Sequence, residues 1–144
     1  MNGFMSNIND CTLLELTKIH NPSGNITIVQ NGEIQSFCIK RIYYLYDVPG
    51  GAKRGGHAHK NLYQVIVAAS GSFDIILDDG KNKTTVNLNR PNLGMLVVPG
   101  IWRELVNFSS GAICLVLASQ QYDENDYIRD YSDFLKLKDD TFDF

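Results

Sequence analysis

The sequence predicts an all-β domain, either a sandwich or a barrel, that ends in one short helix. Short segments rich in β-branched and aromatic residues follow one another, with turn signals every ~8–12 residues, as in all-β domains. Helical spacing occurs only near the end, where Ile128, Tyr131 and Leu135 recur at intervals of three and four residues. At 144 residues the chain can bury a hydrophobic core, so we expect residues 1–144 to form a single domain.

Two strands joined by a tight connection are expected within residues 1–30. Residues 11–19 alternate well enough for a strand, and residues 26–30 form the second. Asn21-Pro-Ser-Gly-Asn25 between them is a strong turn signal, and Asn31-Gly32 after them is a favoured two-residue turn. Turns therefore set this pair of strands apart from the rest of the chain.

The next strand, over residues 37–46, is long and rich in aromatic and β-branched residues. Because side chains alternate between faces, Arg41 and Tyr43 share one face of this strand. Neither face is purely apolar, so the periodicity leaves open which of them points inward. After a loop over 47–56, the remaining strands are expected at 57–59, 63–69, 72–77, 84–88, 94–98, 102–108 and 112–118.

The terminal helix is expected over residues 123–138. Asp123-Glu-Asn-Asp126 would supply an N-cap and acidic residues for the first turn. The apolar stripe that follows would pack this helix on the sheet.

Composition and charge exclude several classes of protein. The net charge of -3 argues against a nucleic-acid partner, because such proteins usually carry a strong basic excess. No apolar run approaches the length of a membrane span, and the N-terminus lacks the features of a targeting signal, so no membrane partner is expected. The three cysteines, with Cys38 and Cys114 in apolar runs, indicate reduced, buried thiols and a cytoplasmic location.

The segment from Gly51 to Gly71 carries two histidines two residues apart, His57 and His59, which a strand would place on one face. Its spacing, Gly51-x5-His57-x-His59-x4-Gln64-x6-Gly71, resembles the first motif of the cupins. Gly94, Pro99, Arg103 and Asn107 resemble the second cupin motif, with one residue fewer before the proline. The resemblance implies a cupin jelly-roll β-barrel with a polar interior, in agreement with the predicted strands.

Two departures from the cupin pattern argue against a bound metal. Metal-binding cupins use two histidines, a glutamate and a last histidine, whereas this chain has Gln64 and Arg103 at the last two positions. An amide is a poor ligand for a transition metal, and a guanidinium repels a cation. We therefore expect no metal and no other cofactor, with the histidines handling protons instead.

Several longer strings resemble one group of cupins more specifically, the nucleotide-linked sugar 3,4-ketoisomerases, or WxcM-like group. The strings are Ile39-Lys-Arg-Ile-Tyr-Tyr44, Arg54-Gly-Gly-His-Ala-His-Lys60, Leu77-Asp-Asp-Gly80, Pro99-Gly-Ile-Trp102, Leu117-Ala-Ser119 and Tyr122-Asp-Glu-Asn-Asp-Tyr-Ile-Arg129. The resemblance implies a cofactor-independent isomerase that converts dTDP-4-keto-6-deoxyglucose to a dTDP-3-keto-6-deoxyhexose. Such a product leads to 3-amino-3,6-dideoxy sugars of lipopolysaccharide O-antigens or S-layer glycans.

Moving a carbonyl from C4 to C3 needs a base that takes the C3 proton and returns a proton to C4 through an enediol, and histidine suits this task. By analogy with the family, we expect His59 to be the base and His57 to orient it or to bind a substrate oxygen. Tyr43 is expected to donate a proton to a sugar oxygen. These three residues are the predicted catalytic set.

The predicted substrate-binding residues are mostly cationic. An inward-facing Arg41 would need an anionic partner, because an unpaired buried charge is costly, and a diphosphate would provide one. Arg54 is a second candidate for the diphosphate. Gln64, Trp102 and Arg103 are expected to border the same pocket.

The resemblance also implies a homodimer in which the N-terminal strands of residues 1–30 are exchanged between subunits, which would cover open sheet edges. Three other functions remain open: a sugar-nucleotide 3,5-epimerase, a metal-dependent oxygenase and a non-catalytic sugar-nucleotide-binding module. Gln64 and Arg103 argue against the oxygenase. The sequence leaves open whether the product has the galacto or the gluco configuration at C4.

Overall fold

The computed structural model describes residues 3–34 and 37–142 and confirms an all-β fold with one C-terminal helix. Its strands are β1 (Thr12–Glu15), β2 (Thr17–Ile19), β3 (Ile26–Ile28), β4 (Arg41–Leu45), β5 (Arg54–His59), β6 (Gln64–Ser70), β7 (Phe73–Asp78), β8 (Lys83–Leu88), β9 (Leu93–Val97), β10 (Trp102–Val106), β11 (Ile113–Ala118) and β12 (Tyr127–Ile128). Most of them lie close to the predicted positions, although β4 is shorter than predicted, β5 begins within the predicted loop and β12 was not predicted. The helices are α1 (Tyr131–Phe142) and the 3-10 turns η1 (Gly3–Met5), η2 (Ile8–Asp10) and η3 (Glu124–Asp126).

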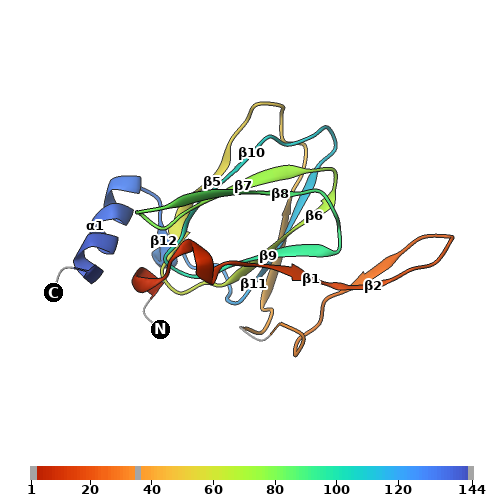
Figure 1. The fold of residues 1–144 in the computed structure, drawn as a ribbon, viewed down its shortest axis with the longest axis horizontal. Coiled ribbons are helices and arrows are strands. Elements are labelled where there is room, and N and C mark those ends of the chain that lie inside the picture. The colour runs from red at the N-terminus through yellow and green to blue at the C-terminus, as the bar shows by residue number, and fades with distance from the viewer. Residues whose placement is uncertain (1–2, 35–36, 143–144) are drawn as a thin grey trace.

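Within residues 3–34 and 37–142, the strands form two five-stranded antiparallel sheets and one separate hairpin. The first sheet has the order β1-β9-β6-β11-β4, the second has the order β12-β5-β10-β7-β8, and β2 pairs with β3 in the hairpin. Figure 1 shows the two sheets wrapped together as in a jelly roll, with α1 at one end and the β2–β3 hairpin projecting from the other. Sequence neighbours such as β5 and β6 thus lie in different sheets.

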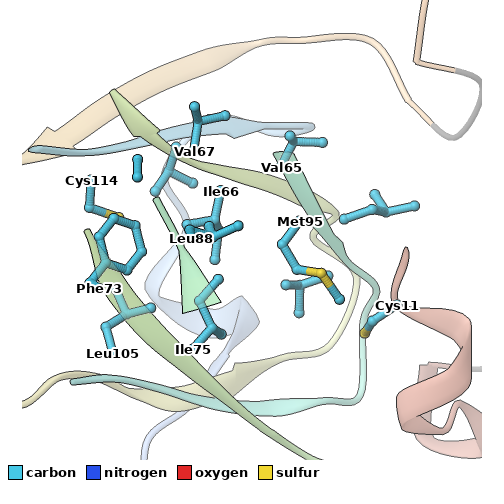
Figure 2. Close-up of a cluster of buried hydrophobic side chains, with 14 of the residues drawn as sticks. Cys11, Val65, Ile66, Val67, Phe73, Ile75, Leu88, Met95, Leu105 and Cys114 are labelled. Atoms are coloured by element: carbon cyan, nitrogen blue, oxygen red, sulfur yellow. The ribbon is translucent and has the colours of Figure 1, made fainter. Parts of the chain in front are cut away.

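The main core fills the space between the sheets (Figure 2). Ile66 of β6 and Phe73 and Ile75 of β7 belong to this core, and all three are at most 2% exposed. Gly71 joins β6 to β7 at a φ of +66°, and a Cβ at this position would lie 2.4 Å from the Ser109 hydroxyl. The last position of the first cupin motif therefore requires glycine, because any larger residue would be strained and would clash in this turn.

The segment predicted to start the terminal helix is mostly not helical. Residues 124–126 form the 3-10 turn η3, and Tyr127 and Ile128 then pair with His59 and Ala58 as the edge strand β12. The helix begins only at Tyr131, so the predicted start at residue 123 is wrong. Asp123 does act as an N-cap, but it caps η3 and not α1. The backbone groups of Tyr127 and Ile128 pair with β5, so they are not available to a helix.

The strand predicted over 11–19 divides at Leu16, whose backbone N–H donates to Asn92 O instead of pairing in a sheet. The part before it, β1, pairs with β9, and the part after it, β2, continues into the projecting hairpin. Ile19 and Ile26 on that hairpin are 49% and 60% exposed. The hairpin therefore has little contact with the sheets of its own chain.

All three cysteines are free thiols, and Cys11 and Cys114 are buried as expected. Cys38 is exposed, contrary to the prediction. The odd-numbered residues of the segment leading into β4 face the core, and Cys38 falls on the opposite parity. Among the described residues, no helix is long and apolar enough to cross a membrane.

Candidate active site

A cavity of about 530 Å³ lies between the two sheets, a volume that suits a small-molecule ligand. Six of the eight predicted site residues line it: Arg41 and Tyr43 of β4, Arg54 and His57 of β5, Gln64 of β6 and Arg103 of β10. The segment after β11 adds Tyr122, Tyr127 and Arg129. Another cavity of similar volume lies beside β1, but no histidine or arginine is among the described residues that line it.

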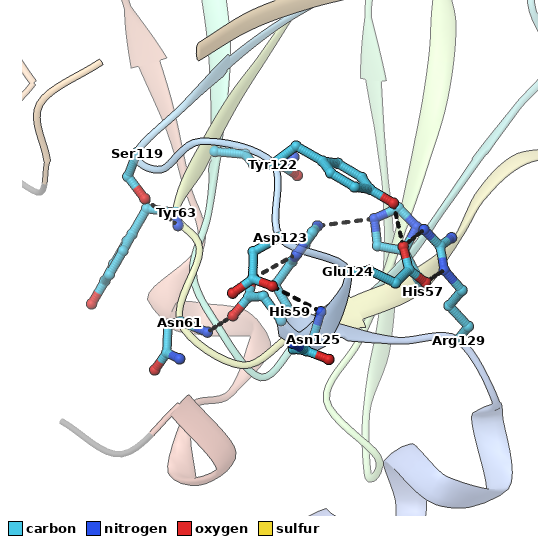
Figure 3. Close-up of polar contacts among 12 residues, drawn as sticks. His57, His59, Asn61, Tyr63, Ser119, Tyr122, Asp123, Glu124, Asn125 and Arg129 are labelled. Atoms are coloured by element: carbon cyan, nitrogen blue, oxygen red, sulfur yellow. Dashed lines mark hydrogen bonds and ion pairs between the residues drawn. The ribbon is translucent and has the colours of Figure 1, made fainter. Parts of the chain in front are cut away.

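The two histidines share one wall, as predicted, but they lie at different depths. Nε2 of His57 is 3.0 Å from Nε2 of His59, and Nδ1 of His59 is 2.9 Å from Oδ2 of Asp126 (Figure 3). His57 lines the cavity, whereas His59 is fully buried behind it. The three side chains form a continuous chain of hydrogen bonds from Asp126 to the cavity.

The direction of these hydrogen bonds follows from the charge of Asp126. Burial opposes its ionisation, but hydrogen bonds from His59 and from the backbone of Asn61 and Leu62 outweigh burial and hold its pKa below the usual value. The carboxylate therefore accepts from Nδ1–H of His59, which leaves Nε2 of His59 as an acceptor for Nε2–H of His57. Nδ1 of His57 then carries the free lone pair.

Both imidazoles are neutral at neutral pH. Burial and the positive charge of Arg103 lower the pKa of His57 to about 2. Burial also lowers the pKa of His59 to about 4, although its hydrogen bond with Asp126 acts in the opposite direction. A neutral imidazole with a free nitrogen toward a cavity can act as a general base.

The depressed pKa of His57 should make folding sensitive to acid. Between its ordinary value of 6.5 and the folded value of about 2, the unfolded chain binds a proton that the folded chain does not, so stability falls as pH falls. From pH 7 to pH 5, we expect the wild type to lose roughly 1–2 kcal/mol more unfolding free energy than His57→Asn. Urea unfolding at both pH values measures this difference.

The control for this comparison is His20→Asn, which removes an exposed histidine bonded to Asn25 in the β2–β3 connection. Because this histidine does not line the cavity, the variant controls for the loss of a histidine as such. Parallel stability profiles for the wild type and His57→Asn would contradict the neutral state of His57.

A second hydrogen-bonded chain crosses the cavity floor. Nη1 of Arg103 donates to Oε1 of Gln64 at 2.5 Å, and Nε2 of Gln64 donates to the Tyr43 hydroxyl at 2.9 Å. Burial raises the pKa of Tyr43, so the phenol keeps its proton. Because the Tyr43 oxygen accepts from Gln64, its own O–H is left to donate into the cavity.

These residues do not fit a metal ion. Arg103 is 1% exposed and occupies the position of the last cupin ligand, and its guanidinium donates a hydrogen bond to the Gln64 oxygen. A cation between the histidines and Arg103 would meet a fixed positive charge. Among the described residues, no cluster of three or more histidine, cysteine or acidic side chains could hold a metal.

Arg41 and Arg54 place positive charge at the cavity wall. The Arg41 guanidinium carbon lies 5.3 Å from the Tyr43 ring centroid and 5.7 Å from that of Tyr122. Its Nε is buried and has no hydrogen-bond partner among the described residues. Arg54 is exposed at the cavity rim. A buried donor without an acceptor is costly, which favours an anionic ligand beside Arg41.

Trp102 does not reach the cavity, contrary to the expectation that it borders the pocket. It precedes Arg103 on β10, so the two side chains point to opposite faces of the sheet. Trp102 is 6% exposed and packs under α1, with ring centroids 5.2 Å from Tyr131 and 5.8 Å from Phe134. Its position is that of a core residue.

Asp126, Tyr127 and Arg129 were not predicted as site residues. All three lie in the segment that was expected to start a helix, where acidic residues have an ordinary explanation as caps. The signal that could have found them was the string Tyr122-Asp-Glu-Asn-Asp-Tyr-Ile-Arg129, which carried part of the family resemblance.

Comparisons with known proteins show what this chain is similar to. A family model described as FdtA (WxcM-like, C-terminal) matches residues 9–139. A TDP-4-oxo-6-deoxy-alpha-D-glucose-3,4-oxoisomerase of Aneurinibacillus thermoaerophilus is 42% identical over 124 residues, covering 86% of this chain and 89% of the relative.

Solved structures show the same fold. The WlaRB TDP-quinovose 3,4-ketoisomerase of Campylobacter jejuni is 47% identical, with a TM-score of 0.84 over 90% of this chain and 99% of that one. A mutant of the 3,4-ketoisomerase QdtA from Thermoanaerobacterium thermosaccharolyticum, in complex with TDP-4-keto-6-deoxyglucose, is 33% identical, with a TM-score of 0.91 over 96% and 100% of the two chains. These matches confirm the resemblance on which the jelly-roll prediction rested, and the chain belongs to the FdtA family of WxcM-like, C-terminal domains.

Proposed function

We propose that this protein is an isomerase that converts dTDP-4-keto-6-deoxyglucose to a dTDP-3-keto-6-deoxyhexose without a cofactor. The observation that carries this proposal is the chain Asp126–His59–His57, which ends in a neutral imidazole at a cavity with arginines in its wall. The named activities of the relatives support the same reaction.

In this mechanism His57, not His59, is the base. Both ring nitrogens of His59 are engaged, and its side chain is fully buried, whereas His57 borders the cavity. Nδ1 of His57 takes the C3 proton, the electron pair forms the C3=C4 bond, and negative charge develops on O4. Nε2–H of His57 can move toward His59 as the imidazolium forms, and Asp126 stabilises that charge.

Tyr43 and Arg103 serve the oxygens of the sugar. The Tyr43 hydroxyl gives its proton to O4 and takes one from O3, while the positive charge of Arg103 stabilises the enediolate. His57 then returns its proton to C4, and O3 becomes the new carbonyl oxygen. Gln64 acts through both residues, since its amide bridges them.

The diphosphate is bound by Arg41 and Arg54. The unpartnered Nε of Arg41 supplies a buried donor, and Arg54 at the rim adds a second charge. Arginine suits phosphate because its planar fork donates two parallel hydrogen bonds.

The protein acts as a cytoplasmic homodimer in which the N-terminal strands are exchanged. The β2–β3 hairpin projects from its own sheets with Ile19 and Ile26 exposed. On the edge strand β4, Tyr44 is exposed, as is Tyr46 just after it. Pairing a hairpin with a partner's edge strand would cover both apolar surfaces. The 3-keto product would then be aminated to a 3-amino sugar for a surface glycan.

Incubation with dTDP-4-keto-6-deoxyglucose in deuterated water tests the reaction. The expected result is a 3-keto product, identified by NMR after trapping of the ketone with an aminotransferase. Deuterium should appear at C4 in the fraction of turnovers in which the His57 imidazolium exchanges its proton with solvent before returning it. Exchange at C3 and C5 with the carbonyl still at C4 would indicate a 3,5-epimerase. If the protein binds the nucleotide sugar but neither isomerises it nor exchanges its hydrogens, it is a non-catalytic binding module.

A further inference from the structure

The mouth of the cavity carries an ion pair that the mechanism above does not use. Nε and Nη2 of Arg129 donate to the two oxygens of Glu124 at 2.6 and 2.9 Å, and the Tyr122 hydroxyl donates to the same carboxylate. Figure 3 shows these side chains together with His57. Arg129 lines the cavity, whereas Glu124 is absent from its wall.

Arg129 is held in place by more than this ion pair. Its guanidinium carbon lies 4.1 Å from the centroid of the Tyr127 ring, and Tyr127 is fixed in turn by strand pairing with His59. Stacking on Tyr127 would therefore keep the guanidinium beside the cavity even without Glu124. The guanidinium of Arg129 donates two hydrogen bonds to the Glu124 carboxylate, and it would bind a phosphate with the same bidentate geometry.

Arg129 can leave Glu124 for another anionic partner at little cost in free energy. Arg129 and Glu124 are 53% and 55% exposed, and exposed ion pairs contribute little to stability. Arg129 is also the one cavity arginine that forms an ion pair within the described residues, since Arg41, Arg54 and Arg103 form none.

We propose that Arg129 is a third diphosphate-binding residue and that Glu124 is a latch, which holds its guanidinium in the free enzyme and gives it up to the substrate. This proposal rests on the proposed function, because it needs an anionic substrate. Glu124 is a positioning residue that acts through Arg129. Its carboxylate competes with the diphosphate, so the latch reduces affinity while keeping the guanidinium at the mouth.

The direction of the effect distinguishes a latch from a structural ion pair. Glu124→Gln keeps the shape of the side chain and removes the competing charge, so KM for the sugar nucleotide and Kd for TDP should both fall by about three- to tenfold. The change should fall on KM and not on kcat. Arg129→Gln should raise both constants, and Glu124→Gln should have no further effect in that background because the competing partners act through one group.

The matched control is Asp133→Asn, which removes one negative charge from an exposed position on α1. It should leave KM and Kd unchanged. Titration of TDP by calorimetry measures affinity independently of turnover, so an inactive wild type would overturn the proposed reaction while the latch is still tested. Weaker or unchanged TDP binding by Glu124→Gln would overturn the latch, as would equal tightening by Asp133→Asn. Both Glu124 and Asp133 are exposed, so we expect the variants to fold.

Discussion

His57→Asn is expected to abolish isomerisation, with kcat reduced by about 10²–10⁴-fold, the range in which general acid–base groups contribute. The substituted amide has no basic nitrogen for the C3 proton, so loss of the base should prevent the first step. Affinity for TDP should stay within a few-fold, because Arg41 and Arg54 remain in place. Single-turnover kinetics and TDP titration measure the two effects separately.

Chemical rescue can decide which histidine is the base. His57→Ala would open space directly on the cavity, where added imidazole can enter and take the C3 proton. His59→Ala would leave a space behind His57 that is closed from solvent, since His59 is 0% exposed. We therefore expect imidazole to restore activity to His57→Ala and not to His59→Ala. The opposite pattern would return the role of base to His59, as the sequence had suggested.

Asp126→Asn should lower kcat by about 10²–10⁴-fold with little change in KM, although it changes only one atom of the side chain. Oδ1 of Asp126 accepts from the backbone N–H of Asn61 at 2.7 Å, so an asparagine would keep its oxygen there and turn its NH₂ toward His59. Nδ1 of His59 must then accept, which places its proton on Nε2. His57 would in turn accept at Nε2 and carry its proton on Nδ1, the atom that must be free.

Nitrogen NMR of the histidine rings can report this exchange of tautomers in Asp126→Asn independently of turnover. The expected observation is protonated Nδ1 on His57 in the variant and protonated Nε2 in the wild type. If Asp126→Asn acted only by weakening the pairing of β12, the histidines of the folded molecules would keep the wild-type tautomers. Near-normal kcat in this variant would rule out the relay.

Local periodicity was enough to predict several features of the site. The two-residue spacing of His57 and His59 placed them on one wall, and the same parity placed Arg41 beside Tyr43. The residue types at positions 64 and 103 already argued against a metal ion beside the histidines. The hydrogen bond from Arg103 to Gln64 fits this expectation, because it engages the Gln64 oxygen. The two inferences about shared strand faces succeeded because the face of a strand depends only on the alternation of its own side chains.

The depth and the partners of the same residues required the tertiary structure. The parity of the strand could not show that His57 borders the cavity while His59 lies behind it. The buried position of His59 involves a hydrogen bond with Asp126, which is 67 residues away in the sequence. The acidic segment around Asp126 was predicted as a helix start, since capping and strand pairing use the same residue types and only contact with β5 favours the second.

Trp102 shows the same limit, since its place under α1 depends on where the chain end packs. The all-β class, the family and the residues that share each strand face could be read from the sequence. Only the folded chain decided which of those faces meets the cavity and which histidine has a free nitrogen. The reason is that burial and hydrogen-bond partners come from segments far apart in the sequence, about which a local pattern holds no information.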